Sequence, residues 1–322
     1  MKTRFFRGLV LALAAAATGA LAQLYPSKPV KVIVGFAPGG VVDTPARIVA
    51  TRLGELWGTS LVVENRPGAG GSTAAAYAAK QPADGYTLLA CNTASHGVNS
   101  AIYKQLGYDP VKDYVAISQI GFVPNVLLVH PAVEIRSIRE LVAYAKANPG
   151  KLSMASAGVG TSQHMSIELL KSMTGVDITH VPYKGGAPAL SDLLGGQIPS
   201  LVTGLPAGLG AVRSGRARAL GVTTEKRASQ LPDVPTIAEA GVPGYEVYSW
   251  VGFCAPAGVP KAIVAKLNAD IVKVLAMPDT LQKLSDQGIE AAPNTPEQFT
   301  AFVAAEIAKW AKVVKAAGIA PE

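Results

Sequence analysis

The segment VKVIVGFAPGGVVDTPA, residues 30–46, is the clearest indication of the fold class. Its first five residues predict a buried β-strand, and the next six form a glycine-rich loop. Apolar residues then recur at helical spacing as far as Leu56. Pro45 suits the first turn of this helix, and we expect Asp43 or Thr44 to cap it. A strand that leads through a glycine loop into a helix is typical of α/β proteins.

The same order of elements returns in the middle of the chain. Residues 151–156 predict a strand, residues 157–162 a loop of small residues, and residues 163–173 a helix. Upstream, Ser137 and Glu140 form a capping box that predicts the start of another helix. The chain therefore carries two units of strand, glycine loop and helix.

Further strands and helices extend these units into two α/β lobes. We expect strands at residues 61–64, 86–90, 125–130, 177–181, 198–203, 218–223 and 245–254, and helices in the C-terminal tail. Lobe I should consist of residues 23–124 and 250–322, with lobe II, residues 125–249, as an insertion. Two crossing segments between lobes indicate a hinge and a cleft, where ligands preferentially bind.

The N-terminus has the layout of a secretory signal peptide. Lys2, Arg4 and Arg7 form a positive region, and residues 9–17 are apolar. Ala20-Leu21-Ala22 then supplies a small-x-small cleavage signal. The apolar run is too short to span a bilayer. We expect residues 1–22 to be removed and the mature protein to lie in the periplasm.

Composition narrows the function classes. Of 322 residues, 49% are hydrophobic and 16% charged, which excludes an intrinsically disordered chain. The net charge of +7 is spread along the chain without a run of like charges, so nucleic-acid binding gains no support. Cys91 and Cys254 are the only cysteines. They could form a disulfide in an exported protein, but we favour two buried free thiols because both follow apolar strand-like runs.

A search for catalytic motifs finds none that is complete. The metalloprotease and phosphate-loop motifs are absent, and residues 154–158 (MASAG) only approach the GxSxG motif of serine hydrolases. The four histidines are widely separated, so we expect neither a metal nor a cofactor. A Ser–His–Asp triad assembled in space remains an open alternative, but we do not expect an enzyme.

The glycine loops are the stronger signal. Backbone N–H groups in a tight loop at the start of a helix make an anion site, which the helix dipole reinforces. The sequence offers this twice, at residues 35–43 and 157–164, and neither loop contains Lys or Arg. Two such loops facing across a cleft could hold one carboxylate, or the two ends of a dicarboxylate, by backbone and hydroxyl donors and water.

Six segments resemble the signatures of the Bug-type extracytoplasmic solute receptors, which are the substrate-binding components of tripartite tricarboxylate transporters. In chain order they are Gly35–Arg47, Val63–Gly71, Pro82–Leu89, Tyr183–Gly186, Leu231–Thr236 and Ala255–Pro260. The resemblance implies a type II periplasmic-binding-protein fold, in which two α/β lobes close on a small di- or tricarboxylate or aromatic acid. It also implies a membrane permease as partner, and we expect a monomer. A periplasmic sensor for a signalling kinase, or less plausibly a secreted hydrolase, is the alternative.

The resemblance also implies which residues hold the ligand. From lobe I they are Phe36, Gly39, Val41, Val42 and Asp43, and from lobe II Gly160, Thr161, Ser162 and His164. Ser95, His96 and Tyr183 are weaker candidates for the far end of the pocket. Whether Asp43 caps a helix or contacts the ligand stays open at this point.

Two departures from the family pattern bear on the ligand. Val41 stands where the first loop often has serine, so a hydroxyl is lost. Residues 202–206 (VTGLP) stand where many members have Phe-Asp-Asn-Leu-Pro, so an acidic side chain that would suit an ammonium group is missing. An amino acid is therefore the less favoured ligand.

Overall fold

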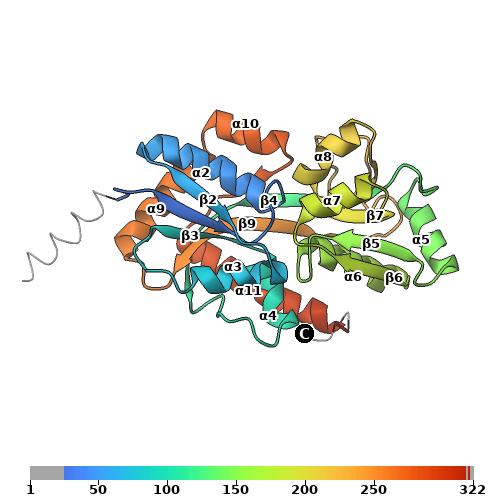
Figure 1. Ribbon diagram of the computed structural model, residues 1–322, viewed down its shortest axis with the longest axis horizontal. Helices are drawn as coiled ribbons and strands as arrows, with labels where there is room; N and C mark the ends of the chain where they lie inside the picture. Colours follow the sequence, from blue (N-terminus) through green and yellow to red (C-terminus); the bar gives the residue numbers. More distant parts are fainter. Residues whose placement is uncertain (1–24, 317, 320–322) are drawn as a thin grey trace, which may run out of the picture.

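The computed structural model describes residues 25–316, 318 and 319 (Figure 1). The predicted signal peptide, residues 1–22, lies outside the described residues. The strands are β1 (Val30–Val34), β2 (Leu61–Asn65), β3 (Thr87–Asn92), β4 (Tyr114–Val129), β5 (Leu152–Ser156), β6 (Ile178–Pro182), β7 (Ser200–Gly204), β8 (Arg218–Val222), β9 (Tyr248–Pro256) and β10 (Glu290–Ala291). The main helices are α2 (Asp43–Trp57), α3 (Ser72–Ala78), α4 (Asn99–Ile102), α5 (Ile138–Ala147), α6 (Ser162–Thr174), α7 (Gly186–Leu194), α8 (Leu205–Arg213), α9 (Lys261–Leu275), α10 (Pro278–Asp286) and α11 (Pro296–Ala316).

The strands join into one 10-stranded sheet with the order β2-β1-β3-β9-β4-β7-β5-β6, to which β8 and β10 add by pairing with β4. β4 is long enough to belong to two sheet regions. Its residues 114–124 pair with β9, and its residues 125–129 pair with β7. The molecule thus has a first half, built on β1–β3, β9 and β10, and a second half, built on β5–β8 (Figure 1).

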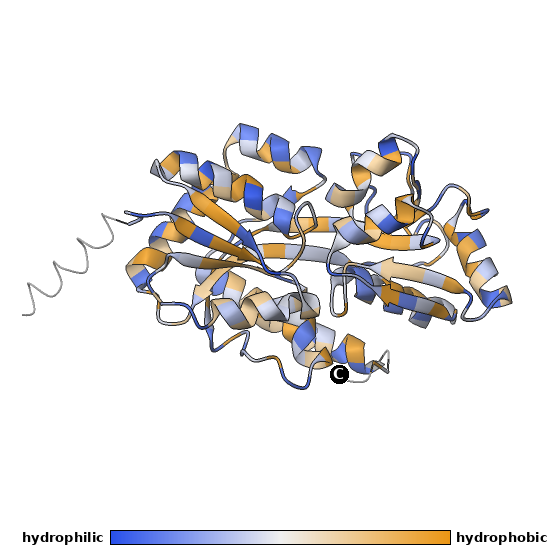
Figure 2. Cartoon of the chain, in the orientation of Figure 1, coloured by the Kyte–Doolittle hydropathy of each residue, from blue (hydrophilic) through white to orange (hydrophobic). Residues whose placement is uncertain are grey.

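Helices cover the sheet in both halves, and the α/β class expected from the sequence is confirmed (Figure 1). Central strands are mainly apolar, since both faces are packed: every residue of β3 is buried, and so are four of the five residues of β1. Most helices carry both hydrophobic and hydrophilic residues (Figure 2). One apolar cluster fills the space between β1, α2 and α9 in the first half, and another lies beneath α7 and α8 in the second.

Several local predictions are confirmed and others are wrong. Ser137 accepts a hydrogen bond from the N–H of Glu140 at the start of α5, as the capping box predicts. At α2 the predicted cap is wrong, because the N-cap residue is Val42, without a side-chain cap, and Asp43 is the first helical residue. Pro45 does lie in the first turn.

β4 begins at Tyr114, well before the predicted strand, because its first part pairs with the distant β9.

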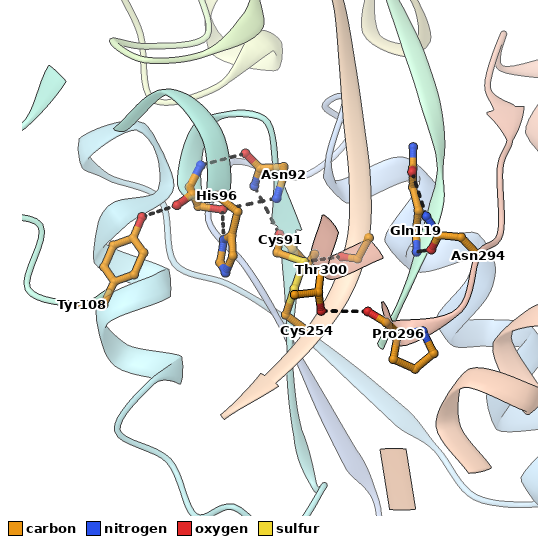
Figure 3. The surroundings of a disulfide bond; sticks show 12 residues. Cys91, Asn92, His96, Tyr108, Gln119, Cys254, Asn294, Pro296 and Thr300 are labelled. Atoms are coloured by element: carbon orange, nitrogen blue, oxygen red, sulfur yellow. Dashed lines mark hydrogen bonds between the residues drawn. A yellow bond between two sulfur atoms is a disulfide. The ribbon is translucent and has the colours of Figure 1, made fainter. Parts of the chain in front are cut away.

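The two cysteines form a disulfide, so the expectation of free thiols is wrong (Figure 3). Cys91 lies on β3 and Cys254 on β9, which are antiparallel neighbours, and their Cα atoms are 5.9 Å apart. The bond joins the segment before the second half to the segment after it, 163 residues later in the chain. It therefore ties together the two parts of the chain that build the first half.

No helix in the described part of the chain is both long and apolar enough to cross a membrane.

The long helix α11 packs along β4 and continues to the region of α4. Its buried Glu306 accepts hydrogen bonds from the indole N–H groups of Trp250 and Trp310, each at 2.9 Å. The bond from Trp250 joins α11 to β9, whereas Trp310 lies on α11 itself, one turn after Glu306.

Candidate functional site

Both glycine loops lie where the two halves of the molecule meet. The first loop follows the carboxyl end of β1 and the second follows that of β5, the edge at which α/β proteins bind ligands. From the first loop, the N–H of Ala37 donates to the carbonyl of Lys184 at 3.4 Å, and Val41 packs against Gly204. We call this region of contact between the halves the seam.

The second loop meets the first half at different residues. Gly70 lies against the carbonyl of Val159, and Gly160 lies against the side chain of Asn99. Asn99 is fully buried and donates to the carbonyl of Gly70 at 3.0 Å and to Ser72 Oγ at 2.8 Å. The seam therefore brings both loops to the boundary of the opposite half, each against its own set of partners.

Asp43 holds the first loop together. Its Oδ2 accepts from the N–H of Gly39 at 2.9 Å and from Arg47 Nε at 2.7 Å, and its Oδ1 accepts from Asn65 Nδ2 at 2.8 Å. Asn65 Nδ2 also donates to the carbonyl of Phe36 at 2.8 Å. Since both carboxylate oxygens of this buried side chain are occupied within the protein, Asp43 fixes the loop that carries Phe36 and Gly39.

Thr161 caps the helix that follows the second loop. Its hydroxyl accepts from the N–H of His164 at 3.2 Å and donates to the carbonyl of Gly158 at 2.7 Å. Ser162 lies beside it and accepts from Asn125 Nδ2 at 3.2 Å. All four predicted residues of this region, Gly160, Thr161, Ser162 and His164, are buried.

The helix starts leave backbone donors unpaired at the seam. The first N–H groups of a helix have no partner within it, and no hydrogen bond among the described residues uses the N–H of Val42, Asp43, Ser162 or Gln163. The dipoles of α2 and α6 make these ends positive, by about half an elementary charge each. Such an arrangement can hold an organic anion without a basic side chain.

Buried polar side chains beside these donors were not found from the sequence. Gln163 Nε2 donates to Asn125 Oδ1 at 2.8 Å, while Gln163 Oε1 has no hydrogen-bond partner among the described residues. Thr203 Oγ1 and Asn99 Oδ1 are likewise buried without a hydrogen-bond partner among the described residues. Asn125 lies where β4 changes its pairing partner, and only the fold reveals that position.

A cavity of about 150 Å³ lies at the seam. Residues 35–36 and 68–71 line it from the first half, and residues 157–159 and 182–184 from the second. It includes two of the predicted site residues, Phe36 and Tyr183. The Tyr183 hydroxyl donates to Asp192 at 2.6 Å, and this bond is the main cause that raises the pKa of Tyr183 to about 12.

Ser95 and His96 lie inside the first half. They line neither this cavity nor the larger groove that also lies between the halves. Ser95 Oγ is 3.0 Å from His96 Nδ1, and the imidazole packs edge-on against Tyr114 at 4.7 Å between ring centroids. Complete burial lowers the pKa of His96 to about 3. The structure thus places this pair apart from Phe36 and Tyr183.

A larger groove of about 830 Å³ also spans both halves. Phe122 and Tyr248 belong to its lining, together with residues 224–230 of the second half and residues 288–291 of the first. It contains none of the predicted site residues. In the described part of the chain, no group of three or more His, Cys, Asp or Glu side chains could hold a metal ion.

Comparison with known proteins gives a consistent result. A model of the tripartite tricarboxylate transporter family receptor matches residues 45–319. A UPF0065 protein of Pseudomonas sp. (strain P51) is 39% identical, covering 97% of this chain and 94% of its own length. Protein BugT of Bordetella pertussis is 37% identical, covering 97% of this chain and 96% of its own.

Solved structures agree in fold. R. palustris Rpa4515 with adipate has a TM-score of 0.90 and 43% identity, covering 92% of this chain and 100% of that chain. MatC from Rhodopseudomonas palustris with bound malate has a TM-score of 0.84 and 34% identity, covering 90% and 100%. The predicted periplasmic-binding-protein fold is therefore confirmed.

Proposed function

The chain belongs to the tripartite tricarboxylate transporter receptor family, and we propose that it captures a small organic acid between its two halves and delivers it to a membrane permease. We further propose that the halves act as lobes, residues 23–124 with 250–322 and residues 125–249, which close around the ligand. The family is that of periplasmic solute-binding receptors. Removal of residues 1–22 as a signal peptide is part of the proposal.

The observation that carries the proposal is the pair of helix starts at the seam. α2 and α6 come from opposite halves, and each presents N–H groups without partners among the described residues. Their loops are held in shape from within the protein, by Asp43 in the first half and by Thr161 in the second. An anion placed between such preset donors is bound without a cost for ordering them.

The ligand class follows from the surroundings of these donors and from the relatives. Two similar proteins were solved with the dicarboxylates adipate and malate. The one carboxylate of the first loop, Asp43, is occupied by its own partners. We therefore propose a dicarboxylate, tricarboxylate or aromatic acid, and expect glutamate and aspartate to bind weakly because Val202–Gly204 offers no acid to an ammonium group.

Titration calorimetry with adipate, malate, citrate, benzoate and glutamate tests the ligand class. Ser162→Pro tests the backbone grip, because proline removes the N–H at the first helical position, where it is well tolerated. Thr161 already has φ −73° and ψ 159°, the extended conformation that a residue before proline prefers. Ser162→Ala is the matched control, since it loses the hydroxyl and keeps the N–H.

We expect Ser162→Ala to bind the best acid within about threefold of wild type, and Ser162→Pro to bind it at least about tenfold more weakly. Equal affinities of the two variants would rule out the amide grip. Failure of every acid to bind the wild type would rule out the proposed function. Incubation of the same mixtures, analysed over time for product formation, distinguishes a binding protein from an enzyme: a binding protein leaves the acid unchanged.

A further inference from the structure

Two imidazole rings lie stacked beneath the second glycine loop. His164 on α6 and His180 on β6 have ring centroids 4.2 Å apart and planes inclined by 17°. The hydroxyl oxygen of Ser156, the last residue of β5, lies 2.6 Å from His180 Nε2. The three side chains come from three elements that surround the loop.

Two side chains of this group, His164 and Ser156, accept hydrogen bonds from backbone amides of the loop, and His180 contacts the hydroxyl of Ser156. The N–H of Gly160 donates to His164 Nδ1 at 3.3 Å. The N–H of Gly158 donates to Ser156 Oγ at 3.0 Å, and this hydroxyl is in turn bound by His180. Both glycine amides are thus turned inward. The N–H groups of Ser162 and Gln163, at the start of α6, remain without partners among the described residues.

We propose that His164 and His180 are positioning residues for carboxylate capture, which hold the loop of Gly158 and Gly160 so that the amides at the start of α6 face the ligand. Neither imidazole touches the ligand in this arrangement. The inference rests on the proposed function, and it replaces the expectation that His164 is itself a ligand contact.

The role requires a neutral imidazole at His164, since a protonated Nδ1 carries a hydrogen and cannot accept from Gly160. The charged groups that face His164 are Glu168, whose Oε1 is 3.9 Å from its Nε2, and Lys171, which pairs with Glu168 at 3.0 Å. Burial is the main cause that lowers the pKa of His164 to about 3 and that of His180 to about 4, with Lys171 adding to both shifts and His180 to the first. Both rings are therefore neutral at neutral pH.

Asparagine and glutamine separate positioning from mere packing. In His164→Asn the side-chain oxygen takes the place of Nδ1 and can accept from Gly160, whereas His164→Gln places its oxygen near the position of Nε2. Both variants keep a polar side chain, so a general loss of stability would affect them alike. His130→Asn is the control, because His130 Nδ1 accepts from the N–H of Ala132 at 3.2 Å, far along the chain from this loop.

Hydrogen exchange of the Gly160 amide in ligand-free protein measures directly how well the loop is held. Calorimetry with adipate measures the effect of the loop on ligand affinity. In His164→Gln we expect exchange about tenfold faster than in wild type and affinity about tenfold lower, while His164→Asn stays within about threefold for both. In wild type the protection of Gly160, corrected for intrinsic exchange, should fall as the pH drops through about 3, where His164 is protonated, and His164→Asn should keep it.

Equal affinity of His164→Gln and His164→Asn, in a protein that binds adipate, would overturn the positioning role alone. Unchanged protection of Gly160 in His164→Gln would overturn it as well. If wild type binds no carboxylate, the proposed function fails together with the capture role. The exchange data would then report only whether the imidazoles support the loop.

Discussion

Gly70 and Val159 approach each other so closely that a β-carbon on Gly70 would lie 2.3 Å from the carbonyl oxygen of Val159. Gly70 belongs to the first half and Val159 to the second. The backbone of Gly70 has φ +56°, which L side chains rarely adopt. The two halves can therefore meet as closely as they do here only with glycine at position 70.

Gly70→Ala should hold the halves apart. The added methyl group meets the backbone of Val159, which cannot move aside without shifting the second loop. We expect a larger radius of gyration by small-angle X-ray scattering and at least about tenfold weaker carboxylate binding. Gly58→Ala is the matched control: its φ is +63°, but nothing lies within 4 Å of the added carbon. If both variants scatter like wild type, the close approach at Gly70 does not limit closure.

Asp43→Asn should destabilise the first loop. The amide that replaces one carboxylate oxygen is a donor and would face donors, since Gly39, Arg47 and Asn65 all donate to Asp43. We expect a loss of about 1.5–3 kcal/mol in the free energy of unfolding, measured by urea denaturation, and weaker carboxylate binding. Glu64→Gln breaks a pair with Arg66 that is partly exposed on both sides and should cost less than about 1 kcal/mol. Similar losses in the two variants would contradict the special role of Asp43.

Removal of the disulfide should lower stability. Cys91→Ala with Cys254→Ala opens a link between residues 163 positions apart, which frees the unfolded chain more than it alters the fold. We expect the free energy of unfolding to fall by about 2–5 kcal/mol, with ligand affinity nearly unchanged because the bond lies between β3 and β9. The prediction fails if the double variant melts at the same temperature as wild type under non-reducing conditions.

His96 should make stability depend on pH. The pKa of His96 is about 3 in the folded protein and about 6.5 in an unfolded chain, so between these values the unfolded state binds the extra proton. Stability therefore falls as the pH drops below about 6.5, by up to about 1.4 kcal/mol per pH unit.

His96→Phe fills the same space next to Tyr108 and Tyr114 without a titrating group. The difference in unfolding free energy between pH 7 and pH 4.5 should shrink by about 2–3 kcal/mol in this variant. His130→Phe, at a partly exposed position, is the control. An unchanged pH profile in His96→Phe would show that His96 does not bind a proton on unfolding in this range.

Features that depend on neighbouring residues were predictable from the sequence. The strand at residues 30–34, Pro45 in the first turn of α2, and the capping box of Ser137 and Glu140 all follow from local periodicity and local hydrogen bonding. The same holds at the start of α11, where Thr295 and Gln298 cap each other. The α/β class followed because these units repeat along the chain.

Partners far apart in the chain were not predictable in this way. The sequence offered two readings of Cys91 and Cys254, and only the antiparallel pairing of β3 with β9 decides for the disulfide. The first part of β4 was missed, since its strand partner lies more than a hundred residues away. The stacking of His164 on His180 brings a helix and a strand into contact, and no sequence motif predicts it.

Most strands and helices, the two glycine loops and the resemblance to a receptor family were predictable from the amino-acid sequence, because each depends on residues close together in the chain. The folded structure was needed to show that Asp43 holds its own loop, that Gly70 meets Val159, and that the loops lie at the boundary between the halves. These contacts depend on how distant segments are packed. Residue type and spacing limit those arrangements but do not select one.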